Sequence, residues 1–248
     1  MHSTGVEGLD KLLGGGLNKG ENVVWQHESG TFVDEFTLAF MRAGILEGRQ
    51  VICFEFRFPP QAIQNIIGPL VSTLPKGWEE KFLLLDCFSD SAGWKEFIFS
   101  DFYNTAPPWI RKVPSANDPS DFHQFFGRIE RDVMEPESRL VFQSLTRMEH
   151  LWGREKTREF FTHVCPALYA YNTLAYWTLD KRAHQEEFLA SIEHSTQIVI
   201  ELERANAGKN ILRVKKAWNR YDSTTYQPAP YHAKSSEIRL EVSGRGRT

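Results

Sequence analysis

The chain has 248 residues, 41% hydrophobic and 25% charged, so it can bury a full core as one large domain. Its formal net charge of −3 supplies no overall attraction for nucleic acid or an anionic membrane. Three cysteines, an odd number without paired spacing, argue against a disulfide framework or a zinc site. Because no signal peptide and no apolar run of about 18 residues is visible, we expect a cytoplasmic protein without a membrane segment.

Strand-like and helix-like runs alternate along most of the chain. In chain order they are strand 22–26, helix 33–47, strand 50–56, helix 59–74, strand 81–86, helix 121–134, strand 139–143, helix 157–171, strand 173–179, helix 181–195 and strand 197–202. Repeated strand–helix–strand units predict an α/β fold, with a mostly parallel sheet covered by helices on both faces. In such sheets, ligands bind beyond the carboxyl ends of the strands.

The remaining segments differ from this alternation. Residues 89–120 mix aromatic side chains with Asn, Pro and Ser, and we expect an irregular insertion there. Strands 211–216 and 237–242 follow connections too short for crossover helices, so they should join the sheet antiparallel. No internal repeat or linker divides the chain, which predicts a single domain over 1–248 with a flexible tail at 243–248.

The most distinctive motif lies in residues 1–20. It reads Thr-Gly-Val-Glu-Gly-Leu-Asp from Thr4 to Asp10 and Leu-Leu-Gly-Gly-Gly-Leu from Leu12 to Leu17. Physically, this is a short helical turn followed by a glycine-rich bend that enters the first strand. The whole string resembles the opening of the KaiC-like branch of the RecA/KaiC family of P-loop ATPases.

The resemblance extends to the later strands, at 51–55, 140–148, 198–203 and 211–216. It implies a RecA-like three-layer sandwich, in which a mostly parallel central sheet lies between two helical layers and the C-terminal strands run antiparallel. It also implies ATP and magnesium as the ligands of an active member, and rings or filaments as the form of assembly.

The segment after the first strand departs from that family. A phosphate-binding loop reads Gly-x-x-x-x-Gly-Lys-Ser/Thr, because glycines let backbone N–H groups converge and the lysine reaches the phosphates. Residues 26–37 read Gln-His-Glu-Ser-Gly-Thr-Phe-Val-Asp-Glu-Phe-Thr, without a lysine. Asp34 and Glu35 suit the start of a helix but would repel a triphosphate. Ser29, Gly30 and Thr31 remain as the vestige of an anion site.

The magnesium and catalytic positions are altered as well. By the resemblance, the aspartate of the family's magnesium site corresponds to Gln143, which is followed by Ser144. The neutral amide of a glutamine offers no charge to a hard cation. Glu55 matches the first member of the family's catalytic glutamate pair, whereas Phe56 occupies the second position.

The family also uses a Lys-x-Arg pair that reaches the nucleotide of a neighbouring subunit. Lys216 aligns with that lysine, Trp218 occupies the arginine position, and Arg220 is the nearest replacement. The histidines do not share metal-ligand spacing, so we expect no metal site in the protein itself.

Three functions stay open. The first is a catalytically degenerate KaiC-like protein that acts as a regulatory, scaffolding or assembly subunit, with no cofactor and with itself or an active paralogue as partner. The second is an atypical ATPase that binds ATP and magnesium through Ser29, Gly30 and Thr31, with Glu55 as base and Lys216 supplied by a neighbour. The third is RecA-like nucleic-acid binding, which the net charge does not support.

Overall fold

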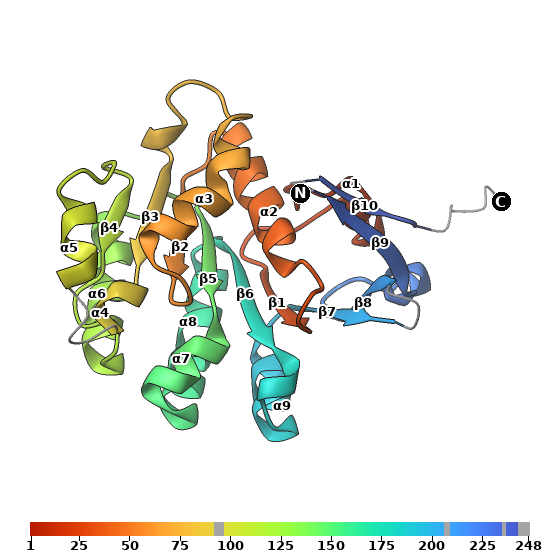
Figure 1. Cartoon of the computed structure of the whole chain (residues 1–248). Coiled ribbons are helices and arrows are strands. Elements are labelled where there is room, and N and C mark those ends of the chain that lie inside the picture. The colour runs from red at the N-terminus through yellow and green to blue at the C-terminus, as the bar shows by residue number, and fades with distance from the viewer. Residues whose placement is uncertain (92–96, 206–208, 235–236, 243–248) are drawn as a thin grey trace.

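The structure is a computed structural model that describes residues 1–91, 97–205, 209–234 and 237–242. Its centre is a sheet of ten strands in the order β10-β9-β8-β7-β1-β6-β5-β2-β3-β4 (Figure 1). The strands from β7 to β4 in this order run parallel, and β8, β9 and β10 are added antiparallel. Their bounds are β1 Asn22–His27, β2 Val51–Glu55, β3 Phe82–Asp86, β4 Ile110–Lys112, β5 Arg139–Gln143, β6 Leu174–Asp180, β7 Ile198–Arg204, β8 Asn210–Ala217, β9 Ala229–Lys234 and β10 Glu237–Leu240.

Helices cover both faces of this sheet. Alternation along the strands divides the core: Val23 and Trp25 of β1 face one hydrophobic cluster and Val24 faces the other. The first cluster contains residues of α1, α2 and α3, and the second contains residues of α6, α7, α8 and α9. The helices are α1 Glu7–Leu12, α2 Val33–Leu46, α3 Pro60–Val71, α4 Phe88–Ser91, α5 Phe97–Tyr103, α6 Pro119–Asp132, α7 Leu145–Trp152, α8 Arg154–Ala170 and α9 Glu186–Ser195.

This arrangement confirms the predicted three-layer fold and its antiparallel C-terminal strands. Two helices differ from the prediction. The expected helix 157–171 is α8, but a separate helix, α7, precedes it directly after β5. The expected helix 181–195 divides into a 3₁₀ turn, Lys181–Ala183, and α9.

The segment 89–120 is more regular than expected. It contains α5 and the edge strand β4, and α6 already begins at Pro119, where the Asp118 carboxylate caps two backbone N–H groups. Residues 92–96 and the predicted tail 243–248 lie outside the described residues.

The N-terminal motif forms a bracket against the sheet. The Asp10 carboxylate accepts hydrogen bonds from the Thr4 N–H, 2.7 Å away, and the Ser3 hydroxyl, 2.6 Å away. Gly5 adopts a φ of +83°, and a Cβ there would lie 2.0 Å from the Ala39 carbonyl oxygen of α2. Only glycine allows this approach, so the motif has a structural role in seating α2.

Candidate functional site

The sequence-predicted site lies at the carboxyl edge of the parallel strands. Glu55 ends β2, Gln143 ends β5, and the two residues are register partners in neighbouring strands. His27 ends β1, and the helix α2 begins close by, after a five-residue connection over 28–32. Strand topology therefore brings together three of the segments in which the family resemblance locates nucleotide chemistry.

In the connection between β1 and α2, the polar groups of Thr31 bond within the chain. The Thr31 N–H and hydroxyl both donate to the Glu28 carbonyl oxygen, at 3.3 and 2.7 Å. The Thr31 carbonyl oxygen accepts from the Tyr231 hydroxyl at 2.5 Å. Ser29 and Gly30 are exposed at the tip, where Gly30 has a φ of +81°. The loop is a tight turn, and its Thr31 donors are directed into the turn itself.

Aromatic residues hold the start of α2. Phe36 is buried against Trp25, with ring centroids 4.7 Å apart, and against Tyr231, at 5.3 Å. Phe32, which precedes the helix in the left-handed conformation, is instead 49% exposed. Of the two phenylalanines that follow the turn, Phe36 therefore anchors the helix to the core.

Arg57 occupies the space between β2 and the start of α2. Its Nη1 lies 2.9 Å from Asp34 Oδ1, and its Nη2 lies 3.2 Å from Glu55 Oε2. The Arg57 N–H also donates to Glu55 Oε1 at 2.7 Å. Glu55 is buried, and burial raises its pKa to about 7 although Arg57 opposes the shift. Burial lowers the pKa of Arg57, but the two carboxylates outweigh it and the pKa is raised.

Gln143 lies beside this ion-paired group. Its Nε2 donates to the Thr37 hydroxyl of α2 at 2.8 Å, while its buried Oε1 has no hydrogen-bond partner within the described ranges. Asp34, Thr37, Glu55, Arg57 and Gln143 border a cavity of about 20 Å³ that is also lined by apolar side chains of α2, α3, β2 and β3. That volume suits one water molecule and is far too small for a phosphate group with its magnesium.

Ser144 is a helix cap. Its hydroxyl oxygen accepts a hydrogen bond from the Arg147 N–H at 3.2 Å, at the first turn of α7. The residues predicted as a vestigial anion site therefore do not act together. Gln143 lies in the site, whereas Ser144 and Thr31 form hydrogen bonds within their own turns.

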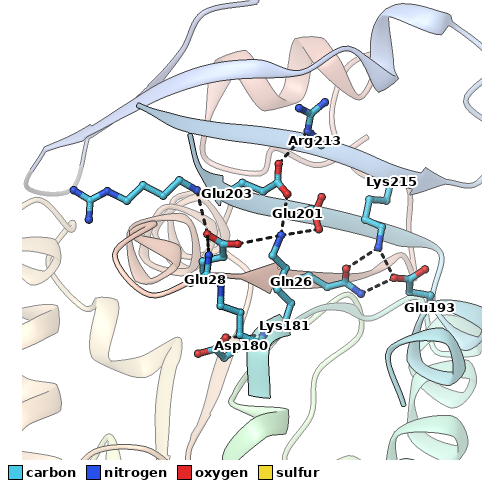
Figure 2. A network of polar contacts seen from close by, with 11 residues as sticks. Gln26, Glu28, Asp180, Lys181, Glu193, Glu201, Glu203, Arg213 and Lys215 are labelled. Carbon is cyan, nitrogen blue, oxygen red and sulfur yellow. Dashed lines mark hydrogen bonds and ion pairs between the residues drawn. The ribbon is translucent and has the colours of Figure 1, made fainter. Parts of the chain in front are cut away.

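A second polar network covers the end of β1 (Figure 2). Lys181, which follows β6, places its Nζ 3.0 Å from Glu201, 2.9 Å from Glu203 and 3.4 Å from Glu28. Arg182 contacts Glu28 Oε2 at 3.0 Å. Burial raises the pKa of Glu28, but the Arg204 N–H and Lys181 outweigh it and the pKa is lowered. Lys181 and Arg182 are thus paired with carboxylates of the same chain, whereas the Arg204 guanidinium lies beside the turn, with Nη1 3.5 Å from the position that a Cβ on Gly30 would take.

A hydroxyl–imidazole–carboxylate chain, which sequence reasoning missed, lies next to α7. The Thr146 hydroxyl is 2.8 Å from His184 Nε2, and Glu149 pairs with His184 Nδ1. Only 1% of the His184 side chain is exposed. The Thr146 oxygen also accepts from the Asp180 N–H, and the chain therefore fastens α7 to the end of β6.

Lys216 and Arg220 both bind groups of their own chain. Lys216 Nζ donates to the Glu193 and His194 carbonyl oxygens at the end of α9, at 2.6 and 3.2 Å. Arg220 forms a bidentate pair with the buried Glu21, at 2.6 and 2.8 Å, and also donates to the Leu13 and Gly16 carbonyl oxygens. Lys216 pairs with Val199 near the start of β7, at the amino edge and away from Glu55.

Among the described residues, no group of three or more His, Cys, Asp or Glu side chains is placed to hold a metal ion. Over the same part of the chain, no helix is both long and apolar enough to cross a membrane.

The family model described as "ATPase: KaiC" matches residues 2–240. A KaiC-like protein of the hyperthermophilic archaeon Pyrococcus horikoshii is similar with a TM-score of 0.66 and 17% identity, over 96% of this chain and 97% of that one. An uncharacterized P. horikoshii protein in complex with an unknown peptide has a TM-score of 0.69 and 14% identity, over 98% and 100%. A search of curated proteins finds no match. At these identities the two structures establish the fold alone.

Proposed function

This chain belongs to the KaiC family of ATPases, and we propose that it is a catalytically degenerate member that acts through protein contacts. Its role would be that of a regulatory, scaffolding or assembly subunit. The observation that carries the proposal is Arg57, whose ion pairs with Asp34 and Glu55 fill the space between β2 and the start of α2.

These ion pairs oppose any ligand that would take their place. Separating a buried charge from its partner costs about 3–5 kcal/mol. A ligand that had to displace Arg57 from Glu55 would lose about a hundredfold to several thousandfold in affinity, at 1.4 kcal/mol per factor of ten. The segment from Glu21 to Arg42 contains no lysine that could compensate. The cost of displacing Arg57 and the lack of a compensating lysine favour a pocket that the protein's own side chains close.

An atypical ATPase is the second candidate, and one observation favours it. Glu55 ends a strand at the expected edge with a pKa raised to about 7, which suits a general base. The weakness of this candidate is that it needs a cation to bind the phosphates. Lys216, the proposed donor from a neighbour, already caps α9.

Nucleic-acid binding has less support. The basic side chains of β8 each contact an acidic or carbonyl group of the same chain: Arg213 contacts Glu203, Lys215 contacts Glu193, and Lys216 caps α9. We therefore do not propose it as a function.

Partner binding has a candidate surface of exposed aromatic residues. Trp218 and Tyr169 are 44% and 43% exposed with ring centroids 6.2 Å apart, and Tyr221 is 89% exposed. Tyrosine and tryptophan are enriched among the residues that dominate protein interfaces. The partner in this proposal is a second copy of the chain or an active paralogue. The three free, buried cysteines suit the reducing cytoplasm in which it would act.

The test compares phosphate release from ATP and magnesium by the wild type and by Glu55→Gln. The proposal predicts equal, background rates for both proteins. A wild-type rate above background that Glu55→Gln abolishes would instead establish the ATPase. Light scattering with and without ATP adds a second readout: the proposed subunit keeps the same mass in both conditions.

A further inference from the structure

A separate pocket opens at the amino edge of the sheet, opposite the edge that carries Glu55 and Gln143. It lies where α6 and α8 end and the chain turns into β5 and β6, and its volume is about 450 Å³. That size is within the range of small-ligand sites. The lining residues are Gly127, Glu130, Arg131, Met134, Glu135, Pro136, Tyr171 and Thr173.

Glu130 is the unpaired charge of this pocket. Its Oε1 is buried and has no hydrogen-bond donor within the described ranges. The other charged lining residues are paired: Arg131 with Asp132 at 2.8 Å, and Glu135 with Lys81 at 2.9 Å. Burial raises the pKa of Glu130, and His163 of α8, the facing titratable group, opposes the shift. A buried carboxyl oxygen without a donor is costly, so the site favours a ligand that supplies one.

The backbone adds to the preference for a cation. Both α6, of 14 residues, and α8, of 17 residues, end at this pocket, which includes Tyr171, the residue after the last turn of α8. The carbonyl ends of helices carry partial negative charge and stabilise cations. Two helix ends and one unpaired carboxyl group therefore all favour a positively charged ligand.

The walls determine which kind of cation fits. Met134, Pro136 and the 61% exposed Tyr171 present apolar and aromatic surface beside Glu130. A small hydrated ion gains nothing from such walls, and the described residues include no cluster of acidic ligands for a metal ion. An arginine combines methylene groups for the walls, a planar group that stacks on tyrosine, and paired donors for a carboxylate.

We propose that this pocket binds an arginine side chain from a segment of a partner protein, with Glu130 as the carboxylate that receives the guanidinium. The source of the arginine, a partner protein, rests on the proposed function. The pocket and its chemistry do not, because they lie at the other edge of the sheet from the nucleotide position.

The test is an NMR titration of the full ¹⁵N-labelled chain with the blocked pentapeptide acetyl-Gly-Gly-Arg-Gly-Gly-amide. We expect saturable shifts of the Gly127, Met134, Tyr171 and Thr173 amide signals. The matched peptide with citrulline in place of arginine, which has the same shape without the charge, should bind at least about tenfold more weakly, since charge-assisted hydrogen bonds are roughly twice as strong.

Variants complete the design. Glu130→Gln should weaken binding of the arginine peptide about tenfold while the spectrum of the variant stays that of a folded protein. Glu155→Gln, an exposed change at the start of α8, should leave binding unchanged. Equal binding of the two peptides, or unchanged binding by Glu130→Gln, overturns the proposal. Tighter binding of free spermidine than of the arginine peptide also overturns it, since it would make a polyamine the ligand. None of these outcomes depends on whether ATP binds.

Discussion

Replacing Glu55 by glutamine should change how the stability of the protein depends on pH. Burial raises the folded-state pKa of Glu55 from 4.5 to about 7. Between these values the folded state holds a proton that the unfolded state has released, so the contribution of Glu55 to stability is full below pH 4.5 and falls as pH rises toward 7. From these two pKa values, the contribution changes by about 2–3 kcal/mol between pH 5 and pH 8.

Glutamine does not titrate, so Glu55→Gln should lack this dependence. Urea unfolding of both proteins at pH 5 and pH 8 measures it: relative to the variant, the wild type should lose about 2–3 kcal/mol of unfolding free energy at the higher pH. Glu155→Gln, on the exposed face of α8, should follow the wild-type profile. Parallel profiles for the wild type and Glu55→Gln would refute the rise of the Glu55 pKa by burial.

Three other contacts give equally direct expectations. Arg220→Ala leaves the Glu21 carboxylate buried without its partner and should cost about 3–5 kcal/mol in urea unfolding; an unchanged midpoint would contradict the ion pair. Thr146→Val removes the hydroxyl bound to His184 and should cost about 1–3 kcal/mol, measured in the same way; a neutral effect would argue against the buried chain. Lys216→Met should cost about 1 kcal/mol by uncapping α9 without changing the mass in light scattering, whereas dissociation of an oligomer would give this lysine a role between subunits.

Much of the fold followed from local pattern. The strand predicted at 139–143 coincides with β5. The ends of a short apolar strand that is buried on both faces can be located from the sequence itself. β9 was missed because it contains Pro230 and alternates weakly, and its place depends on pairing with β8 and β10. α7 was missed because it has eight residues and begins directly after a strand, leaving little room for a periodic signal.

The candidate site was predictable only in part. Gln143 and Glu55 were expected at strand ends, and the sheet makes them register partners. Arg57 was not predicted, because its role arises only where the start of α2 approaches the end of β2. The one local signal was an arginine two residues after a strand-terminal glutamate. Lys181 was missed for the same reason, since its three carboxylate partners come from β7 and the β1–α2 turn.

Calorimetric titration with ATP and magnesium tests the central claim most directly. If Arg57 closes the space between β2 and α2, the wild type should show no binding heat at millimolar nucleotide. Arg57→Ala should also show none, because it leaves Asp34 and Glu55 to repel the phosphates, and exposed Arg42→Ala provides the control for loss of a positive charge. Micromolar affinity of the wild type for ATP would contradict the account.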